Sequence, residues 1–465
     1  MKMTPLMAAL AAIVVAPALG WAAPAMTPNA GSDTVRSLHP KPEGELDLRY
    51  RKEAPGASVE EISFGIAADY HYIKSAQEVR IYDYALRRIF WVQPSGEFVN
   101  NSLYADVWFR AAELRNRAML GGMLKGAGIA AAKAPGTADP YWAETELGML
   151  SPDMPRSELQ TVEEKSRVRW LLRGDEVAAV RYDQDAVPDS VKPGLRRFWR
   201  TVVQLHPDIA DALAASGKMP AELWIKAKPF GKDPIVAHWT LAAKHWEPAA
   251  PYPLPAHLAA QPANRDGVFP GIFMTLAKNV ADKAMPPSPE TYTARAEAAI
   301  AHQAGLEAML WAIEMNLAQG VPNSPCVDKD PRPYCSLLTR AGPLAKADPR
   351  TAVGFMKQSP AEADRSQFDT LPNAYLLRLL WATRAPGAGV DRKENERDLL
   401  AALKASPVAN FCKDTGDFYA GTWQPFAAWQ AWDFGRAMAG HRNGDLLGGV
   451  DTLEASLASQ EALFF

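Results

Sequence analysis

Charged residues inside an otherwise apolar stretch are the first candidates for chemistry. The sequence YDYALRRIF places Asp83, Arg87 and Arg88 in a run with the composition of a β-strand. Buried charges need partners, so these residues either form a structural ion pair at a sheet edge or bind a small anionic ligand such as a carboxylate. Asp83 and Arg87 are four positions apart and would share one face of a single strand. Both interpretations are open from the sequence.

A dense group of aromatic residues near the C-terminus, within GDFYAGTWQPFAAWQAWDFGRAM, is the second candidate. Exposed Trp side chains suit the binding of a peptide or a sugar, whereas buried ones fill a helical core. We expect Tyr419, Phe426 and Trp432 to be core residues. On an ideal helix Trp429 points about 60° away from Trp432, so one of the two can face outward. Trp423 and Trp429 are therefore the candidates for contact with a partner.

Catalytic and metal-binding motifs are missing from the sequence. It contains no H-E-x-x-H zinc motif, no G-x-S-x-G nucleophile motif and no Walker A lysine. His238 and His245 lie seven positions apart on one predicted strand, so they would point to opposite faces and could not share a metal. His71 lies between two tyrosines and is either a general base or an ordinary half-buried histidine. We therefore predict no catalytic residue, no metal and no cofactor.

The first residues indicate export. Residues 1–25 have a basic start, an apolar run and small residues before a cleavage site, as in a secretory signal peptide. We expect a periplasmic protein if the source is bacterial and a secreted one otherwise. No later segment is apolar enough to cross a bilayer, so we expect no integral membrane segment after cleavage. The net charge of −3 gives no electrostatic basis for binding nucleic acid.

The three cysteines fit an oxidising compartment. Cys326 and Cys335 lie at the two ends of the short loop CVDKDPRPYC, and we predict a disulfide between them. Cys412 is left over and is expected to be a buried thiol. Its pairing with Cys326 or Cys335 instead is an open alternative.

Hydrophobic periodicity divides the rest of the chain. Residues 26–56, rich in Pro, Ser, Gly and charge, are expected to form a flexible leader. Strand-like hairpins alternating with helical segments predict an α+β domain with a mainly antiparallel sheet at 57–247. A linker dense in proline follows at 248–267. Beyond it only helical periodicity remains, so an all-α domain is predicted at 268–465.

The aromatic segment resembles a tetratricopeptide-type helical repeat. Gly416, Tyr419, Ala428 and Trp432 stand at the spacings at which such repeats carry alternating small and bulky residues. Trp423 stands where these repeats usually have a turn glycine. Two irregular hairpins of this kind are arguable within 371–441, and the resemblance implies an α-solenoid-like packing of the C-terminal domain.

These observations favour an exported interaction or scaffold protein that binds a protein or peptide partner through its helical C-terminal domain. One alternative is an enzyme that acts on a sugar or peptide polymer of the cell envelope, because carboxylate catalysis leaves no recognisable spacing in a sequence. A second alternative is a small-anion binding module in the α+β domain, at Asp83, Arg87 and Arg88.

Overall fold

The protein is described here from a computed structural model. It describes residues 44–75, 78–92, 98–128, 139–151, 158–203, 205–227, 234–248, 253, 288–319, 326–327, 330–347, 392–405, 408–439 and 444–459. The predicted signal peptide, the leader as far as residue 43 and the linker except residues 248 and 253 lie outside the described residues. So do residues 371–391, where one of the two predicted repeat hairpins begins.

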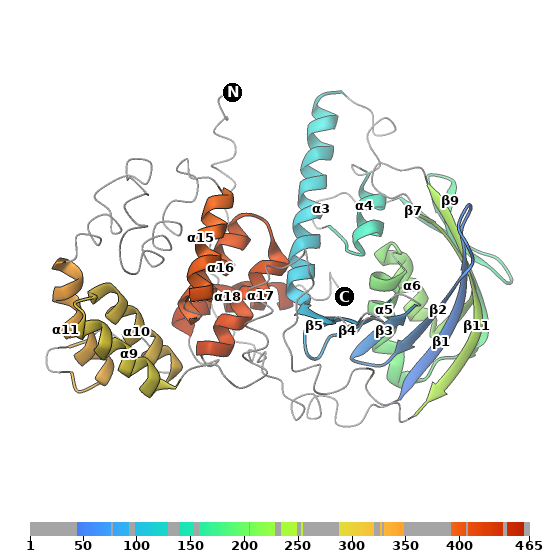
Figure 1. The fold of residues 1–465 in the computed structure, drawn as a ribbon. Helices are drawn as coiled ribbons and strands as arrows, with labels where there is room; N and C mark the ends of the chain where they lie inside the picture. The colour runs from blue at the N-terminus through green and yellow to red at the C-terminus, as the bar shows by residue number, and fades with distance from the viewer. Residues whose placement is uncertain are drawn as a thin grey trace.

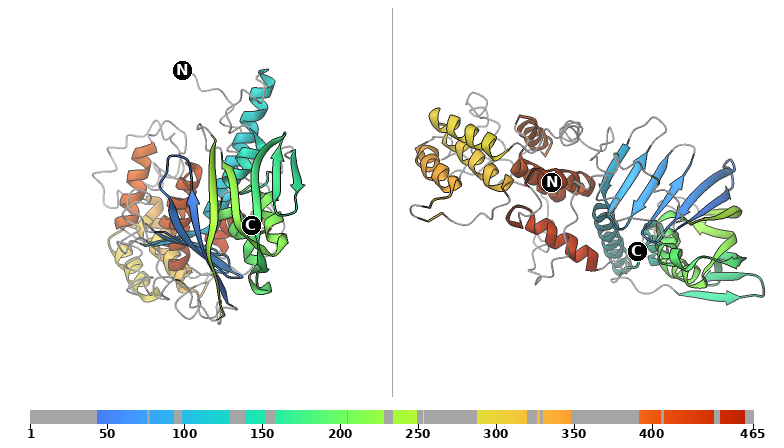
Figure 2. Two further views of the ribbon diagram at one scale, coloured as in Figure 1. Left: turned by 90° about the vertical axis from the view of Figure 1, so that its right-hand side faces the viewer. Right: turned by 90° about the horizontal axis from the view of Figure 1, so that it is seen from below.

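The N-terminal region is one antiparallel sheet of eleven strands, which curves around a group of helices (Figures 1 and 2). The strand order is β6-β5-β4-β3-β2-β1-β11-β10-β9-β8-β7. The strands are β1 Glu45–Glu53, β2 Glu60–Ile66, β3 Tyr70–Lys74, β4 Val79–Asp83, β5 Arg88–Val92, β6 Phe98–Ser102, β7 Leu159–Glu163, β8 Val168–Leu172, β9 Asp175–Ala186, β10 Lys218–Ala227 and β11 Ile235–Glu247.

The first strand shows that the predicted leader ends too late. Strand β1 lies in the middle of the sheet and pairs with both β2 and β11. Its residues Leu46, Leu48 and Tyr50 are buried, and the residues between them are more exposed from Asp47 onward. This alternation of apolar and charged residues is that of a half-buried strand, and it was hidden by the polar composition of the segment. The prediction of a flexible leader is therefore wrong for residues 45–53.

Three short helices cover the concave face of the sheet (Figure 1). They are α4 Pro140–Leu147, α5 Lys192–Val202 and α6 Pro207–Ser216. Their apolar sides share one core with alternate residues of the strands, and Phe64 of β2 contacts Phe198 of α5 edge to face at 5.2 Å. Local signals fix the ends of α6, because the His206 ring accepts from the Asp208 N–H at its start and Gly217 adopts φ 63° after its end.

The described C-terminal part consists of helices, as the sequence predicts. They are α9 Pro289–Ala301, α10 Gly305–Ala318, α11 Pro333–Ala347, α15 Arg392–Ala405, α16 Ala409–Gly421, α17 Pro425–Ala439 and α18 Gly444–Ser459. The expected fold class is thus confirmed: an antiparallel sheet with helices comes first, and a helical region follows.

Close packing between α16 and α17 depends on a glycine. A Cβ at Gly416 would lie 2.3 Å from the Trp432 ring, so only glycine lets this indole approach the helix. The Trp432 Nε1–H donates to Asp417 Oδ1 at 3.0 Å, and Tyr419 and Ala428 are buried nearby in the same core. The small and bulky residues of the resemblance therefore pack as expected, while the assignment of repeats itself stays a prediction.

The long helix α3, Leu103–Gly126, joins the two regions. It follows the edge strand β6 directly and contacts α4 on one side and α17 and α18 on the other. Ala105, Val107 and Leu114 of this helix belong to the core that the C-terminal helices share. Residues of α3 and of the C-terminal helices therefore share one hydrophobic core, although the predicted linker at 248–267 separates them in the sequence.

A buried carboxyl group connects α10 to α16. Glu314 of α10 accepts hydrogen bonds from the Ala409 and Asn410 backbone N–H groups, both at 3.1 Å, and from Asn410 Nδ2 at 2.7 Å. It thus satisfies N–H groups at the first turn of α16 that have no partner within the helix. Burial outweighs these hydrogen bonds and raises the pKa of Glu314 to about 7.

We expect the stability of the helical region to fall as the pH rises through neutrality. The pKa of Glu314 is raised in the folded state, so its contribution is complete below the unfolded value of 4.5 and is lost as the pH passes about 7. A shift of this size corresponds to about 3 kcal/mol in the free energy of unfolding. Urea titrations of the wild type and of Glu314→Gln, which cannot ionise, measure the effect. If the free energy of unfolding changed with pH in the same way in both proteins, Glu314 would not be the source of the pH dependence.

Candidate functional site

The charged residues Asp83, Arg87 and Arg88 surround a turn between two strands instead of lying on one strand. Asp83 ends β4, is fully buried, and its Oδ1 accepts from the Leu86 N–H at 2.7 Å. Arg87 lies in the turn with φ 55°, and its carbonyl accepts from the Leu103 N–H at 2.9 Å. The expectation that Asp83 and Arg87 share a strand face is wrong, because the turn at residues 84–87 is mostly apolar and does not interrupt the strand-like run in the sequence.

Arg88 belongs to an ion network between the sheet edge and the C-terminal helices. At the start of β5, its Nη1 donates to Asp433 of α17, which also accepts from Arg436. Arg436 is 7% exposed and donates further to Asp451 and Glu454 of α18, both at 2.8 Å. These carboxylates raise the pKa of Arg436, and burial raises that of Glu454. Arg88 is thus engaged by a carboxylate of this chain itself.

The two tryptophan candidates have opposite environments. Trp429 of α17 is 0% exposed, and its Nε1–H donates to Glu454 at 2.8 Å. Trp432 is also buried, so neither residue of this pair faces outward. Trp423, in the turn between α16 and α17, is 40% exposed and has φ 62°. Of the two candidates, only Trp423 presents a surface that a partner can contact directly.

Trp423 is held by an aromatic cluster that the sequence does not reveal. Its ring lies 4.8 Å from that of Trp108 on α3, and Trp108 in turn lies 5.5 Å from the buried Trp429. Phe109 of α3 is exposed and contacts Phe426 of α17 at 6.2 Å. The cluster therefore bridges α3 and the α16–α17 turn, about three hundred positions apart in sequence.

Exposed apolar residues occur again farther along α3, beyond the exposed Asn116. On an ideal helix, one arc of about 120° contains Trp108, Phe109, Met119, Leu120 and Met123. Ala105 and Ala112 lie on the same side and are buried, and Ala105 belongs to the core shared with α17. Farther along, Met119 is 53% and Met123 63% exposed. Among the described residues, helices of this chain contact the first half of this apolar side, whereas side chains of the second half are exposed. We call Phe109, Met119, Leu120, Met123 and Trp423 the open apolar surface.

Sequence periodicity predicts the helix but not this open surface. A helix whose apolar side is half covered has the same pattern as one that is fully covered, because the pattern carries no record of where the neighbouring helices end. The one local signal is Trp423 itself, a bulky residue at a position where glycine is usual in the repeats that this segment resembles.

Two buried histidines show no arrangement for catalysis. His71 of β3 is enclosed by Tyr82, Tyr84 and Phe198, and burial together with Arg197 lowers its pKa to about 3. A neutral, enclosed imidazole of this kind cannot serve as a general base for an external substrate. His206 Nε2 lies 3.1 Å from Glu144 Oε2, and both side chains are buried. This pair joins α4 to the start of α6 and is structural.

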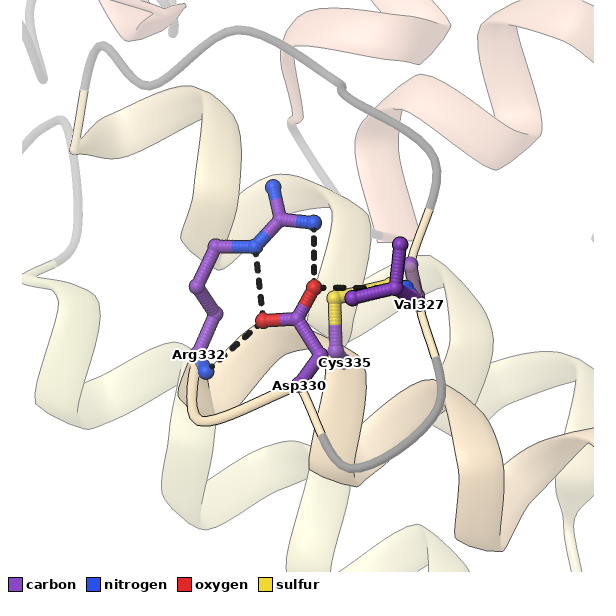
Figure 3. The surroundings of a disulfide bond; sticks show 5 residues. Val327, Asp330, Arg332 and Cys335 are labelled. Carbon is purple, nitrogen blue, oxygen red and sulfur yellow. Dashed lines mark hydrogen bonds and ion pairs between the residues drawn. A yellow bond between two sulfur atoms is a disulfide. The ribbon is translucent and has the colours of Figure 1, made fainter.

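The predicted disulfide between Cys326 and Cys335 is present, with a Cα–Cα distance of 5.6 Å (Figure 3). Asp330 of the same loop accepts from the Arg332 guanidinium at 2.9 and 2.7 Å, which lowers the pKa of this carboxyl. Asp330 and the two sulfurs lie close enough together to suggest a metal site. Disulfide sulfurs are not thiolate ligands, so this loop is a covalent staple. Cys412 is a buried thiol whose pKa is raised by burial.

No helix in the described part of the chain is both long and apolar enough to span a bilayer. No protein-family model and no curated protein matches the sequence significantly. The proposed function below is therefore argued from the geometry of the described residues.

Proposed function

We propose that this chain is an exported binding protein whose open apolar surface takes up an amphipathic helix of a protein partner. One observation carries the proposal. Trp423 is a large exposed aromatic residue at φ 62°, a conformation that costs a bulky residue about 1 kcal/mol or more. A glycine at this position would relieve the strain. A large aromatic residue that is kept there despite the strain is therefore expected to serve binding.

The shape of the surface supports a helical partner. The apolar side of α3 already packs against α17 and α18 of the same chain, so its open half continues an existing helix–helix interface. From Phe109 to Met123 the surface extends for about 21 Å, the length of roughly four helical turns. Flexible methionine side chains at one end and rigid aromatic ones at the other suit an apolar helix face.

Export is the second part of the proposal. It is supported by the signal-like residues 1–25 and by the disulfide of Cys326 and Cys335, which persists in an oxidising compartment. The partner would accordingly be another protein outside the cytoplasm. The resemblance of the helical region to tetratricopeptide-type repeats fits a role in holding peptide segments.

Site-specific photocrosslinking in the native host tests this function. A benzoylphenylalanine residue is placed at Phe109 or Met123, and at the exposed Val59 of the sheet as a matched apolar control. We expect one adduct from both α3 positions, absent at Val59, whose crosslinked peptide maps to an amphipathic helical segment of another protein. Adducts of equal yield at all three positions, or a crosslink to a second copy of this chain, would exclude the proposal.

A further inference from the structure

A basic groove between α5 and α6 has no part in the surface described above. It is an open cavity of about 570 Å³ on the helical side of the sheet. The groove is lined by Lys192, Pro193, Arg196, Arg197, Asp211, Ala214 and Ala215. Three of these side chains are cationic and one is a carboxylate, so the lining carries a net positive charge. The alanines of α6 leave space that larger residues would fill.

The single carboxylate of the lining is shared between two guanidinium groups. Arg196 donates to Asp211 through Nε at 2.8 Å and Nη2 at 3.2 Å. Arg200, whose side chain is fully buried behind the groove, donates to both oxygens of the same carboxylate at 2.8 and 2.9 Å. One negative charge thus faces two positive ones. Burial and the nearby Arg196 charge lower the pKa of Arg200, as expected where positive charge is in excess.

The two other cations of the groove are Arg197 and Lys192. The Arg197 guanidinium lies over the Tyr84 ring, 4.6 Å from its centroid. The positive charge of Arg197 also acts on the buried His71, whose pKa it lowers together with burial. Lys192 pairs with Asp189, a carboxylate whose side chain is 91% exposed. Surface pairs of this kind contribute little, so an anion in the groove can replace Asp189 at low cost.

We propose that this groove binds a small organic anion, with a phosphate or carboxylate group held by Lys192, Arg196 and Arg197 and its carbon skeleton against Pro193 and the two alanines. Planar guanidinium groups suit such oxyanions, because they donate two parallel hydrogen bonds to paired oxygens. The stacking of Arg197 on Tyr84 and the pairing of Arg196 with Asp211 hold both guanidiniums in place before the ligand arrives, which reduces the entropy lost on binding.

Calorimetric titration of the full mature chain with inorganic phosphate and with citrate tests this site. The variant Lys192→Gln/Arg197→Gln removes two cations from the groove. The control variant Lys165→Gln/Arg181→Gln removes one lysine and one arginine charge outside the groove, where Arg181 likewise stacks on an aromatic ring, that of Trp224. We expect one saturable site whose Kd rises by about tenfold or more in the groove variant and not in the control.

A second variant guards against loss of structure. Ala215→Glu leaves every cation in place and adds a carboxylate to the groove, so it should weaken phosphate binding while the melting temperature without ligand stays unchanged. Vesicles of phosphatidylcholine with and without phosphatidylglycerol separate the two sources of the anion. Vesicle binding that only the groove variants lose, without binding of the soluble anions, identifies a lipid headgroup. Equal affinities in groove and control variants, or no saturable binding of any probe, would overturn the proposal.

Discussion

Replacing Arg436 by methionine is expected to lower the free energy of unfolding of the helical region by about 3–5 kcal/mol. The guanidinium is buried and donates to Asp433, Asp451 and Glu454, so its removal leaves three carboxylates around an apolar side chain. Arg88 can compensate only Asp433, to which it is already bonded. Methionine keeps much of the volume of arginine, so the change reports the lost charge more than a cavity.

Denaturant unfolding followed by tryptophan fluorescence measures this effect, since Trp429 lies beside the network. Arg340→Met is the matched control. Arg340 also makes a two-pronged ion pair, with both Glu297 oxygens at 2.6 Å, but both side chains are nearly half exposed. Solvent screening should make the loss of this exposed pair much less costly than the loss of the buried network. Similar losses for the two variants would show that burial does not determine the strength of the network.

Trp423 and Trp429 are expected to separate binding from stability. Trp429→Ala should cost about 3–5 kcal/mol, because it leaves a cavity between Trp108 and Trp432 and removes the hydrogen bond to Glu454. Trp423→Gly should cost much less than this, because the relief of strain at positive φ offsets part of the packing against Trp108 that is lost with the partly exposed indole. The same glycine variant should abolish the partner crosslink at Met123.

Thermal unfolding and the photocrosslinking yield, measured on both variants, decide between these roles. Trp423→Asn is a useful companion, because asparagine tolerates positive φ better than most other residues and brings no aromatic surface. It should behave as the glycine variant does. A Trp423→Gly protein that loses as much stability as Trp429→Ala would show that the exposed indole serves packing against Trp108. A stable one with an undiminished crosslink would remove Trp423 from the binding surface.

Local patterning determined which elements form in much of this chain. The hairpins predicted within 57–247 include β8–β9, in which both strands are present and Gly174 adopts φ 89° at the turn. Helical periodicity after residue 268 predicted the helices that are described there. The spacing of Cys326 and Cys335 was enough for the disulfide. Each of these features depends on residues within about ten positions of one another, a range over which the backbone itself limits the choices.

Hydrophobic periodicity was not enough to predict strand β1 or the turn at Tyr84–Arg87. Strand β1 pairs on one side with β2, which follows it in sequence, and on the other side with β11, almost two hundred positions away. The turn within YDYALRRIF contains no Gly or Pro, and it is stabilised by Asp83 accepting from Leu86 N–H. Neither a distant pairing nor a side-chain bond inside a turn changes the periodicity of the residues themselves.

By itself the sequence determined the fold class, the order of sheet and helices, and the disulfide. Only the tertiary structure decided where the candidate residues lie and what they contact. It brought Arg88 to Asp433, enclosed Trp429, and set Trp423 against Trp108 at the end of a half-covered helix. The physical reason is that burial and pairing of a side chain depend on residues hundreds of positions away, whereas periodicity records only the side of a helix or strand on which it lies.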